Sequence, residues 1–452
     1  MTSLDLAAEA LRFAEADEAD VFVHRERSGL ARFATSVQHQ PTLIENQVVT
    51  LRVVRDGRIG VAVSNRTSDE GLRALARRAG EAAENAPPDP EFPGLADPQS
   101  LPEINGYDAD TADLAADEQA TLAARAIGAS QLPAYGFFTS GVTELAVAST
   151  RGVRAEQTVT DAALLVLASD EGASGYAQRT SWRAGEIDVD ACAREASDKA
   201  ALTRDAREIE PGVYRAVLEP YALGELLQYF GYDSLGALGL LEERSYFAGR
   251  VGEQCFDEKV SLYDDALDPR GLPKAFDFEG APKQRVPLVE NGVVRGVVWD
   301  RRTAKRAGGD AHGTGHAPPL ELEPWGPLPF ALAMNGGDAG SLDDLVSAVD
   351  DGIYITRLHY LGVVHPREGV ITGMTRDGTF RIRDGRIAEP LVNLRFTVAL
   401  PQVLRELPAL TREVMLVNGS DFYGERYPTG MLVPGIATAH FNVTGVGSSP
   451  GI

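Results

Sequence analysis

Closely spaced turn signals between β-forming runs are the feature of this 452-residue sequence that most restricts its fold. Asn-Gly and Asp-Gly pairs supply the positive φ angles that a two-residue hairpin needs. Such pairs recur after residue 290: Asn291-Gly292, Asn335-Gly336, Asp351-Gly352, Asp377-Gly378, Asp384-Gly385 and Asn418-Gly419. This spacing favours a large, mostly antiparallel sheet or a partly closed barrel over alternating strand–helix–strand units. We therefore predict a C-terminal antiparallel β domain over residues 212–452.

The chain before residue 206 differs, because helical and β-type patterns alternate in it. "DVFVHRER" alternates like a half-buried strand, and "TSDEGLRALARRAGEAAENA" has the apolar spacing of a helix. "NQVVTLRVVRDGRIGVAVSN" predicts a hairpin that turns at Asp56-Gly57. We expect an N-terminal α/β region over 1–90, with a mixed sheet and flanking helices, and a central α+β region over 106–206.

A proline-rich segment separates these two regions. Residues 87–105 contain six prolines, which fix φ and remove backbone donors, so this stretch predicts a connection rather than a core element. The whole chain is accordingly expected to belong to the α+β class.

The charge balance limits the partners that this chain can have. With 66 acidic and 43 basic residues the formal net charge is −23, which repels a phosphate backbone and argues against a nucleic-acid partner. Cys192 and Cys255 lie in different predicted segments, which favours a reducing compartment over a disulfide framework. The acidic, amphipathic N-terminus lacks the basic region of a signal peptide and the apolar length of a membrane span. We expect a cytoplasmic protein without a membrane partner.

Several segments, in this order, resemble the TldD/PmbA family, also called the modulator-of-gyrase family. They are "RVVRDGRIGVAVSN", "YRAVLEPYALGELL", "FDFEGAPKQRVPLVENGVV", "YITRLHYLGVVHPREGVITGMTRDGTFRIRDGRIAEPLVNLRF" and "MLVPGIATAHFNVTG". The resemblance runs over nearly the whole chain and is most specific over 354–396. It implies a cytoplasmic metallopeptidase system that acts on unfolded or small peptides. In that system a zinc-bearing TldD-type subunit pairs with a TldE/PmbA-type subunit that lacks the metal.

Two segments indicate which subunit type this chain resembles. In TldD-type members a His-Glu-x-x-x-His motif lies on the helix after the "VLEP"-like strand, and a Gly-x-Cys-Gly segment near the C-terminus supplies a third ligand. The corresponding segments here, "EPYALGELLQYFGYD" and "NGSDFYGERYPTGMLVPG", contain neither histidine nor cysteine. The resemblance therefore implies the metal-free type, with no catalytic residue and no metal ligand in this chain, and with zinc in a heterodimer partner; a homodimer is the alternative. Glu225 remains on the helix and is expected to be a solvated or capping group.

Histidines elsewhere could still form a metal site of another kind. His359 and His365, if they lie on one strand, are roughly 20 Å apart, whereas ligands of one zinc lie within about 4 Å of each other. His312 and His316 have the i, i+4 spacing of a helical pair, but the glycines and prolines of "AGGDAHGTGHAPP" predict a loop. Metal binding, contact with a substrate or partner, and simple surface exposure all stay open for this loop.

The stretch "GVITGMTRDGTFRIRDGRI" predicts two tight turns, at Asp377-Gly378 and Asp384-Gly385. The strands between them could offer an edge to an extended peptide, with Arg376 and Asp377 near the first turn. The alternative is that the Asp residues only build the turns while the Arg residues keep the sheet soluble. His312, His316, Arg376 and Asp377 are thus the candidates for contact with substrate in an enclosed chamber.

The sequence as a whole predicts the metal-free subunit of a TldD/TldE-like peptidase complex with peptide substrates. Two alternatives remain. One is a stand-alone peptidase with an unusual metal site. The other is a peptide- or partner-binding scaffold without proteolytic activity.

Overall fold

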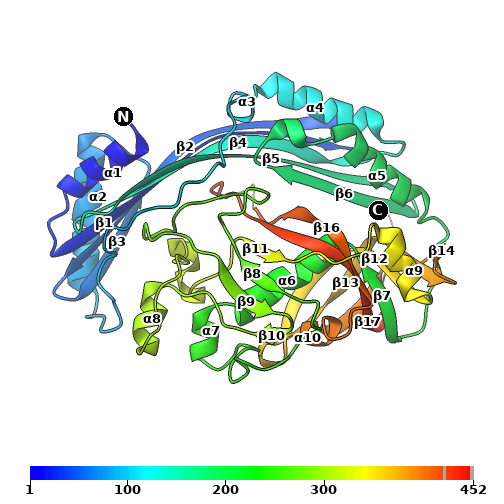
Figure 1. Ribbon diagram of the computed structural model, residues 1–452. Coiled ribbons are helices and arrows are strands. Elements are labelled where there is room, and N and C mark those ends of the chain that lie inside the picture. Colours follow the sequence, from blue (N-terminus) through cyan, green and yellow to red (C-terminus); the bar gives the residue numbers. More distant parts are fainter. Residues whose placement is uncertain (421–423, 448–452) are drawn as a thin grey trace.

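The computed structural model describes residues 1–420 and 424–447, which form two curved sheets with helices packed on them. In Figure 1 the N-terminal sheet arches over the C-terminal domain, which fills its concave side. The helices of the N-terminal part lie on the outer, convex side of the arch (Figure 1). This arrangement of helices and two sheets confirms the predicted α+β class.

The N-terminal sheet has six strands in the order β3-β2-β1-β4-β5-β6. They are β1 (Glu18–Ala34), β2 (Val37–Arg55), β3 (Arg58–Ser64), β4 (Ala134–Ser149), β5 (Arg154–Asp170) and β6 (Ala173–Ser181). The hairpin predicted at Asp56-Gly57 is confirmed, because Arg55 pairs with Arg58 and the two turn residues have φ of 50° and 72°.

Two expectations for this half of the chain need correction. Every pair in the sheet is antiparallel, so the sheet is not mixed. The regions 1–90 and 106–206 also share this one sheet, because β1 pairs along most of its length with β4. The segment 87–105 has no helix or strand, as predicted, but it connects two halves of a sheet rather than two separate units. Local patterns do not reveal a pairing between strands about a hundred residues apart in sequence.

Capped amphipathic helices cover the outer face of this sheet. They are α1 (Ser3–Arg12), α2 (Asp69–Asn85), α3 (Ala109–Ala112), α4 (Ala116–Ala129) and α5 (Val189–Ala201). Thr2 and Ser68 accept backbone hydrogen bonds at the starts of α1 and α2, as good N-caps do. Apolar faces of α1 and α2 pack on β1 and β2 around Leu6, Leu51 and Leu72. The helices thereby bury the outer face of the arch.

The C-terminal sheet has eleven strands, and part of it closes into a ring. The ring arises because β17 pairs with both β15 and β7, the two ends of the path β15-β13-β12-β7. Its strands are β7 (Gly212–Leu218), β12 (Gly352–His365), β13 (Val370–Arg383), β15 (Leu394–Ala399) and β17 (Gly430–Val446). The sheet is mostly antiparallel and partly closed, as predicted, but β7 pairs in parallel with β12, and β11 with β17. Such pairs join strands that are distant in sequence, which turn signals cannot reveal.

The remaining strands extend this sheet, and short helices surround it. The strands are β8 (Leu262–Asp264), β9 (Val286–Glu290), β10 (Val293–Val294), β11 (Leu332–Met334), β14 (Arg386–Pro390) and β16 (Ala409–Asn418). The helices are α6 (Pro220–Ser234), α7 (Ala237–Leu241), α8 (Arg301–Ala307), α9 (Leu342–Val349) and α10 (Leu400–Val403). The described residues also form three 3₁₀ turns: η1 (Ala184–Glu186), η2 (Leu320–Trp325) and η3 (Pro366–Glu368).

The two turns predicted between residues 369 and 387 have different outcomes. Asp384-Gly385 connects β13 to β14 as predicted, with φ of 48° and 66°. Asp377-Gly378 does not reverse the chain. It lies inside β13, where the register against β12 shifts, and its residues have φ of 56° and 127°. This is a β-bulge, which also needs positive φ; a Cβ on Gly378 would lie only 2.5 Å from Thr356 Oγ1.

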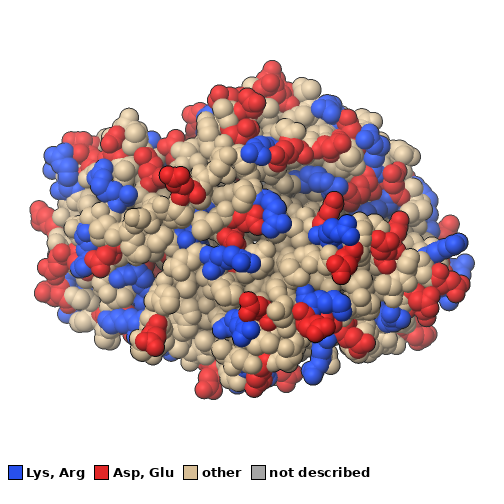
Figure 2. Space-filling model, in the orientation of Figure 1, with Lys and Arg blue, Asp and Glu red and all other residues tan. Residues whose placement is uncertain are grey.

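The surface carries both signs of charge. Figure 2 shows Lys and Arg side chains scattered among acidic ones, without an extended basic area on the visible face. Within the described part of the chain, no helix has the length and apolar character needed to cross a membrane.

Candidate functional site

Helix α6 is held at its first turn by a buried carboxylate. Strand β7 ends at Leu218, and Glu219 leads into Pro220, whose fixed φ suits the first helical position. The Glu219 side chain is almost fully buried and accepts hydrogen bonds from Lys199 Nζ (2.7 Å) and Tyr354 OH (2.7 Å). Lys199 belongs to α5, so this contact fixes α6 against the N-terminal half of the molecule.

A cavity of about 470 Å³ lies beside the C-terminal half of α6, and we call it the α6 groove. Helix α6 contributes Leu227, Gln228, Tyr229, Gly231 and Tyr232. Other walls come from Leu322, Trp325, Leu328, Pro329, Phe330, Leu332, Gly419, Thr429, Gly430 and Met431. The groove therefore joins the two segments in which the family resemblance expects zinc ligands of TldD-type members.

The chemistry of the groove does not fit zinc. Protein sites for zinc use Cys, His and carboxylate groups, and none of these occurs among the described residues that line the groove. No cluster of three or more such groups suited to a metal ion occurs anywhere in residues 1–420 and 424–447. Residues 421–423 of the predicted segment "NGSDFYGERYPTGMLVPG" lie outside the described residues.

Aromatic rings instead dominate the groove. Tyr232 lies with its ring centre 5.9 Å from that of Tyr229 and 6.3 Å from that of Trp325. Gln228 Nε2 donates to Tyr232 OH at 3.0 Å, and burial raises the pKa of Tyr232, so this phenol stays neutral. Tyr232 and Trp325 are 37% and 48% exposed. Such half-exposed rings with polar tips suit apolar side chains and backbone groups of a peptide.

A second, smaller cavity of about 160 Å³ shares Gln228 with the groove and contains Glu225. The Glu225 carboxylate accepts a hydrogen bond from the backbone N–H of Leu358 at 2.6 Å, and burial raises the pKa of Glu225 to about 7. The expectation that Glu225 is a solvated or capping group is therefore wrong. A carboxyl group with a pKa near neutrality can exchange a proton with a bound ligand.

Side chains from the N-terminal sheet close this smaller cavity. Tyr176 and Gln178 project from β6, and Tyr176 OH donates to Gln178 Oε1 at 2.8 Å. The guanidinium of Arg357, on β12, lies 4.3 Å from the centre of the Tyr176 ring. The α6 region thus lies where the two sheets meet.

The structure separates the two histidines predicted to act together. The segment around them is a loop, as predicted, but only His312 is exposed. His316 is fully buried, with Nε2 2.8 Å from Asp264 Oδ1 and Nδ1 3.0 Å from Thr314 Oγ1. Burial lowers the pKa of His316, although Asp264 opposes this effect. His316 consequently does not face an open chamber, whereas contact of His312 with a substrate stays a prediction.

Asp377 has a structural role that the sequence did not reveal. It is 2% exposed and accepts hydrogen bonds from Arg357 Nε (2.6 Å) and from Ser174 Oγ (2.8 Å) of β6. Strand β13 pairs with β12 on one side, and on the other side with β15 before the bulge and with β14 after it, while Asp377 itself contacts Ser174 of β6. Asp377 connects the two sheets rather than offering an edge to a peptide. Arg376 is partly exposed beside it, with Nε 3.8 Å from Asp377 Oδ1.

The aromatic groove residues were not predicted individually. For Tyr229 and Tyr232 the available signal was their position on the helix that carries the zinc motif in TldD-type members. Trp325 lies in η2, about a hundred residues further along the chain, and no local pattern connects it with α6.

Comparison with known proteins agrees with this architecture. Residues 211–445 match the family model of the PmbA/TldA metallopeptidase C-terminal domain, and residues 19–83 match that of PmbA/TldA metallopeptidase domain 1. An uncharacterized protein of Methanocaldococcus jannaschii is 28% identical over 316 residues, which cover 68% of this chain and 71% of that protein. A metalloprotease TldD homolog of Buchnera aphidicola is 24% identical over 290 residues, which cover 61% of this chain and 59% of that protein.

A solved structure has the same fold over nearly its full length. The crystal structure of TldE from Thermococcus kodakarensis superposes with a TM-score of 0.84 and 20% sequence identity, covering 98% of this chain and 99% of that one. At this identity the likeness concerns the fold. The C-terminal family model alone spans about half of the sequence, and with the match of the first domain it shows that this chain belongs to the PmbA/TldD metallopeptidase family.

Proposed function

We propose that this chain is the metal-free subunit of a two-subunit peptidase and that its α6 groove holds part of the peptide. The observation that carries the proposal is the composition of the α6 groove. The two segments expected to hold zinc in TldD-type members meet there. Among the described lining residues α6 presents Leu227, Gln228 and Tyr232, and the second segment presents Thr429 and Met431, rather than metal-binding groups.

The residues of the groove can bind and orient a peptide but cannot activate water in the way a zinc peptidase does. That step needs a metal with an open position and a neighbouring base, and a zinc-bearing TldD-type partner would supply both. Apolar contacts with Tyr232 and Trp325, together with hydrogen bonds to Gln228, would position extended peptides for the partner. Unfolded or small peptides are the fitting substrates, because a folded chain does not expose its backbone in this way.

Reconstitution tests this proposal. The chain and a TldD-type protein from the same genome would be purified and assayed on fluorogenic peptides, each alone and then mixed in equal amounts. We expect no cleavage by this chain alone and cleavage by the mixture at a rate at least about 10-fold above that of the partner alone, because a misplacement of about 1 Å can already cost about 100-fold in rate. Cleavage by this chain alone that is lost in Glu225→Gln would favour the stand-alone peptidase. Failure to associate with the partner would favour a non-proteolytic scaffold.

A further inference from the structure

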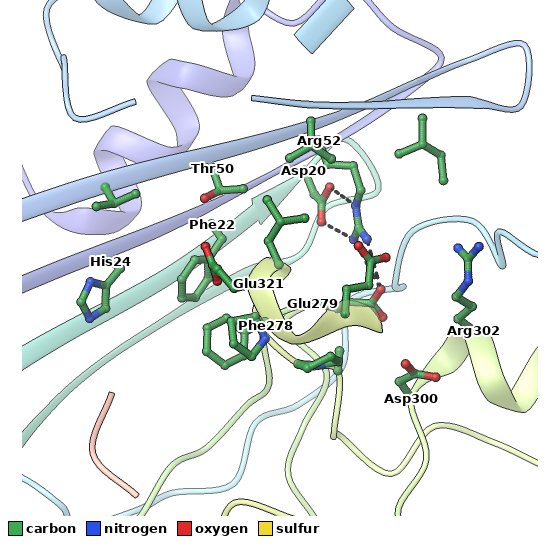
Figure 3. A pocket seen from close by; sticks show the side chains of 18 of the residues that line it. Asp20, Phe22, His24, Thr50, Arg52, Phe278, Glu279, Asp300, Arg302 and Glu321 are labelled. Carbon is green, nitrogen blue, oxygen red and sulfur yellow. Dashed lines mark hydrogen bonds and ion pairs between the residues drawn. The ribbon is translucent and has the colours of Figure 1, made fainter. Parts of the chain in front are cut away.

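A third pocket, distinct from the α6 groove and from the cavity that contains Glu225, lies beneath the inner face of the N-terminal sheet (Figure 3). We call it the acidic pocket. Its volume is about 130 Å³, and it is lined by strands β1 to β3 on one side and by parts of the C-terminal domain, including α8 and η2, on the other, with Phe92 and Pro93 of the segment 87–105 at its edge. Six carboxylates line it: Asp20, Glu279, Asp300, Glu321, Glu323 and Glu425.

The two basic side chains of this pocket neutralise only some of these carboxylates. Arg52 is engaged by Asp20 through two hydrogen bonds of 2.8 and 2.7 Å, and by Glu279 Oε1 at 3.4 Å (Figure 3). Arg302 pairs with Asp89 at 2.7 Å. The charge of the lining therefore stays negative.

His24 presents an unpaired acceptor in the same pocket. It is 2% exposed, and its Nε2 lies 2.8 Å from the backbone carbonyl oxygen of Arg426. A carbonyl only accepts, so Nε2 carries the hydrogen, and in the neutral ring Nδ1 is an acceptor. Nδ1 has no hydrogen-bond partner among the described atoms, and it lies 3.9 Å from Glu425 Oε2.

Glu279 presents a second such atom. Its Oε2 is buried without a hydrogen-bond partner among the described residues, whereas Oε1 contacts Arg52. Burial also raises the pKa of Glu279, as expected for a carboxylate that one arginine shared with Asp20 only partly neutralises. Buried acceptors are normally satisfied, so the unpaired Nδ1 of His24 points to a donor that a ligand supplies. Glu279 Oε2, in contrast, can carry a proton of its own because the pKa of Glu279 is raised to about 7.

The size and the aromatic side chains of the acidic pocket restrict the kinds of ligand that it can bind. The described residues hold no cluster of three metal-binding groups, so these carboxylates are too dispersed to coordinate a metal ion. A volume of about 130 Å³ fits one side chain rather than a whole peptide; an engineered cavity of about 150 Å³ holds benzene. Phe22 and Phe278, with ring centres 4.8 Å apart, add faces that attract cations.

We propose that the acidic pocket binds one alkylammonium group of a peptide, either a lysine side chain or the terminal amino group. The ammonium N–H groups would donate to His24 Nδ1 and to the carboxylate of Glu425, which lies 3.9 Å from it, and the alkyl stem would lie against Phe22 and Phe278 (Figure 3). The inference rests on the proposed peptide substrate and names a class of it: peptides that carry a positive charge.

Calorimetric titration of the isolated full chain tests this without cleavage or a partner, so its outcome is independent of the reconstitution. The probes are the peptide Ala-Ala-Lys-Ala-Ala with a free or an acetylated N-terminus, each with lysine or norleucine. We expect the peptide with an acetylated N-terminus and norleucine to bind at least about 10-fold more weakly than the peptide with both amino groups. This is the scale of losing one hydrogen bond between a charged group and a buried partner. If acetylation lowers the affinity, the terminal amino group is the one that occupies the pocket. If replacing lysine by norleucine lowers the affinity, the lysine side chain occupies it.

Variants at the pocket rim complete the test. Glu321 and Glu425 are exposed, so the double change Glu321→Gln with Glu425→Gln should leave the fold intact while it removes most of the preference for charge. Glu389→Gln, far from the pocket in an exposed pair with Arg383, is the matched control and should bind like the wild type. The proposal is overturned if the wild-type chain binds charged and neutral peptides equally, binds none of them, or keeps its preference in the double variant.

Discussion

The α6 groove and the acidic pocket differ in the chemistry of the side chains that line them. The groove belongs to the C-terminal domain, and its described lining consists mainly of rings and aliphatic groups, with no carboxyl group or histidine. The acidic pocket lies between the N-terminal sheet and the C-terminal loops, and six carboxylates line it. The two proposed sites would therefore bind different parts of a peptide: apolar side chains in the α6 groove and a cationic group in the acidic pocket.

One short segment connects the two sites. Glu425 lines the acidic pocket, and Thr429 to Met431 line the α6 groove. Between them Arg426 is inserted into the N-terminal sheet, where its Nε and Nη2 each lie 2.8 Å from a carboxylate oxygen of Asp161. This buried ion pair therefore positions both sites at once.

The largest effect is expected from Arg426→Ala. The change leaves Asp161 buried and unpaired, and removing one partner of such a pair costs about 3–5 kcal/mol of the free energy of unfolding. Urea unfolding monitored by tryptophan fluorescence measures it. The control is Arg383→Ala, whose pair with Glu389 is exposed and should change the free energy by less than about 1 kcal/mol. Similar values for the two variants would show that Arg426 does not fix the segment.

The two histidines of the C-terminal loop should differ by a smaller amount. His316→Ala removes a buried hydrogen bond to Asp264 and should lower the free energy of unfolding by about 1.5–3 kcal/mol, the range for bonds to charged groups. His312→Ala affects an exposed side chain and should stay within about 0.5 kcal/mol of the wild type. Thermal and urea denaturation of each single variant compare them. Equal stabilities would contradict the buried role of His316.

Groove variants separate binding from folding. Replacing Tyr232 and Trp325 together by Ala removes two half-exposed rings, so the fold should persist while the KM of the assembled complex for peptides rises about 10-fold, or about 1.4 kcal/mol. Tyr107→Ala removes a ring of similar exposure, 45%, outside the groove and serves as the control. An unchanged KM in the double variant would exclude the groove as a peptide site.

The smallest effect concerns pH. Because burial raises the pKa of Glu225 to about 7, the folded chain binds more protons than the unfolded chain between the ordinary carboxyl range and pH 7. This group therefore reduces stability as pH rises through that window. In Glu225→Gln the reduction disappears, so the free energy of unfolding should fall less between pH 5 and pH 8 than in the wild type.

Glu389→Gln is the control for this pH series. Hydrogen bonding to Arg383 lowers the pKa of Glu389 to about 2, so its contribution is lost only as pH falls below the ordinary carboxyl range. Between pH 5 and pH 8 this variant should follow the wild-type curve. A Glu225→Gln curve that also follows the wild type would place the pKa of Glu225 outside this window.

The sequence predicted what depends on neighbouring residues and missed what depends on distant ones. Asp56-Gly57 and Asp384-Gly385 specify hairpins locally, and the helix α6 was expected from the resemblance of its segment to the family. Asp377-Gly378 was misassigned because a dipeptide can require positive φ without reversing the chain. The pairing of β1 with β4 and the closure of the ring by β7 and β17 depend on contacts between segments far apart.

The same limit applies to the sites. The sequence alone shows that α6 contains no histidine. The burial that shifts the pKa of Glu225 and of His316 depends on residues that only the fold brings around them. The residues that line the acidic pocket are spread along the sequence from Asp20 to Glu425, and no local sequence pattern predicts that they lie together.

The most direct test of the central claim is the distribution of zinc between the separated subunits. The chain and its TldD-type partner would be copurified, separated without chelators, and each analysed by inductively coupled plasma mass spectrometry. The account predicts about one zinc per partner chain and less than about 0.1 per chain of this protein, because its described donor groups do not fit the metal. One tightly held zinc on this chain, lost on His312→Ala with His316→Ala in a variant that still folds, would contradict it.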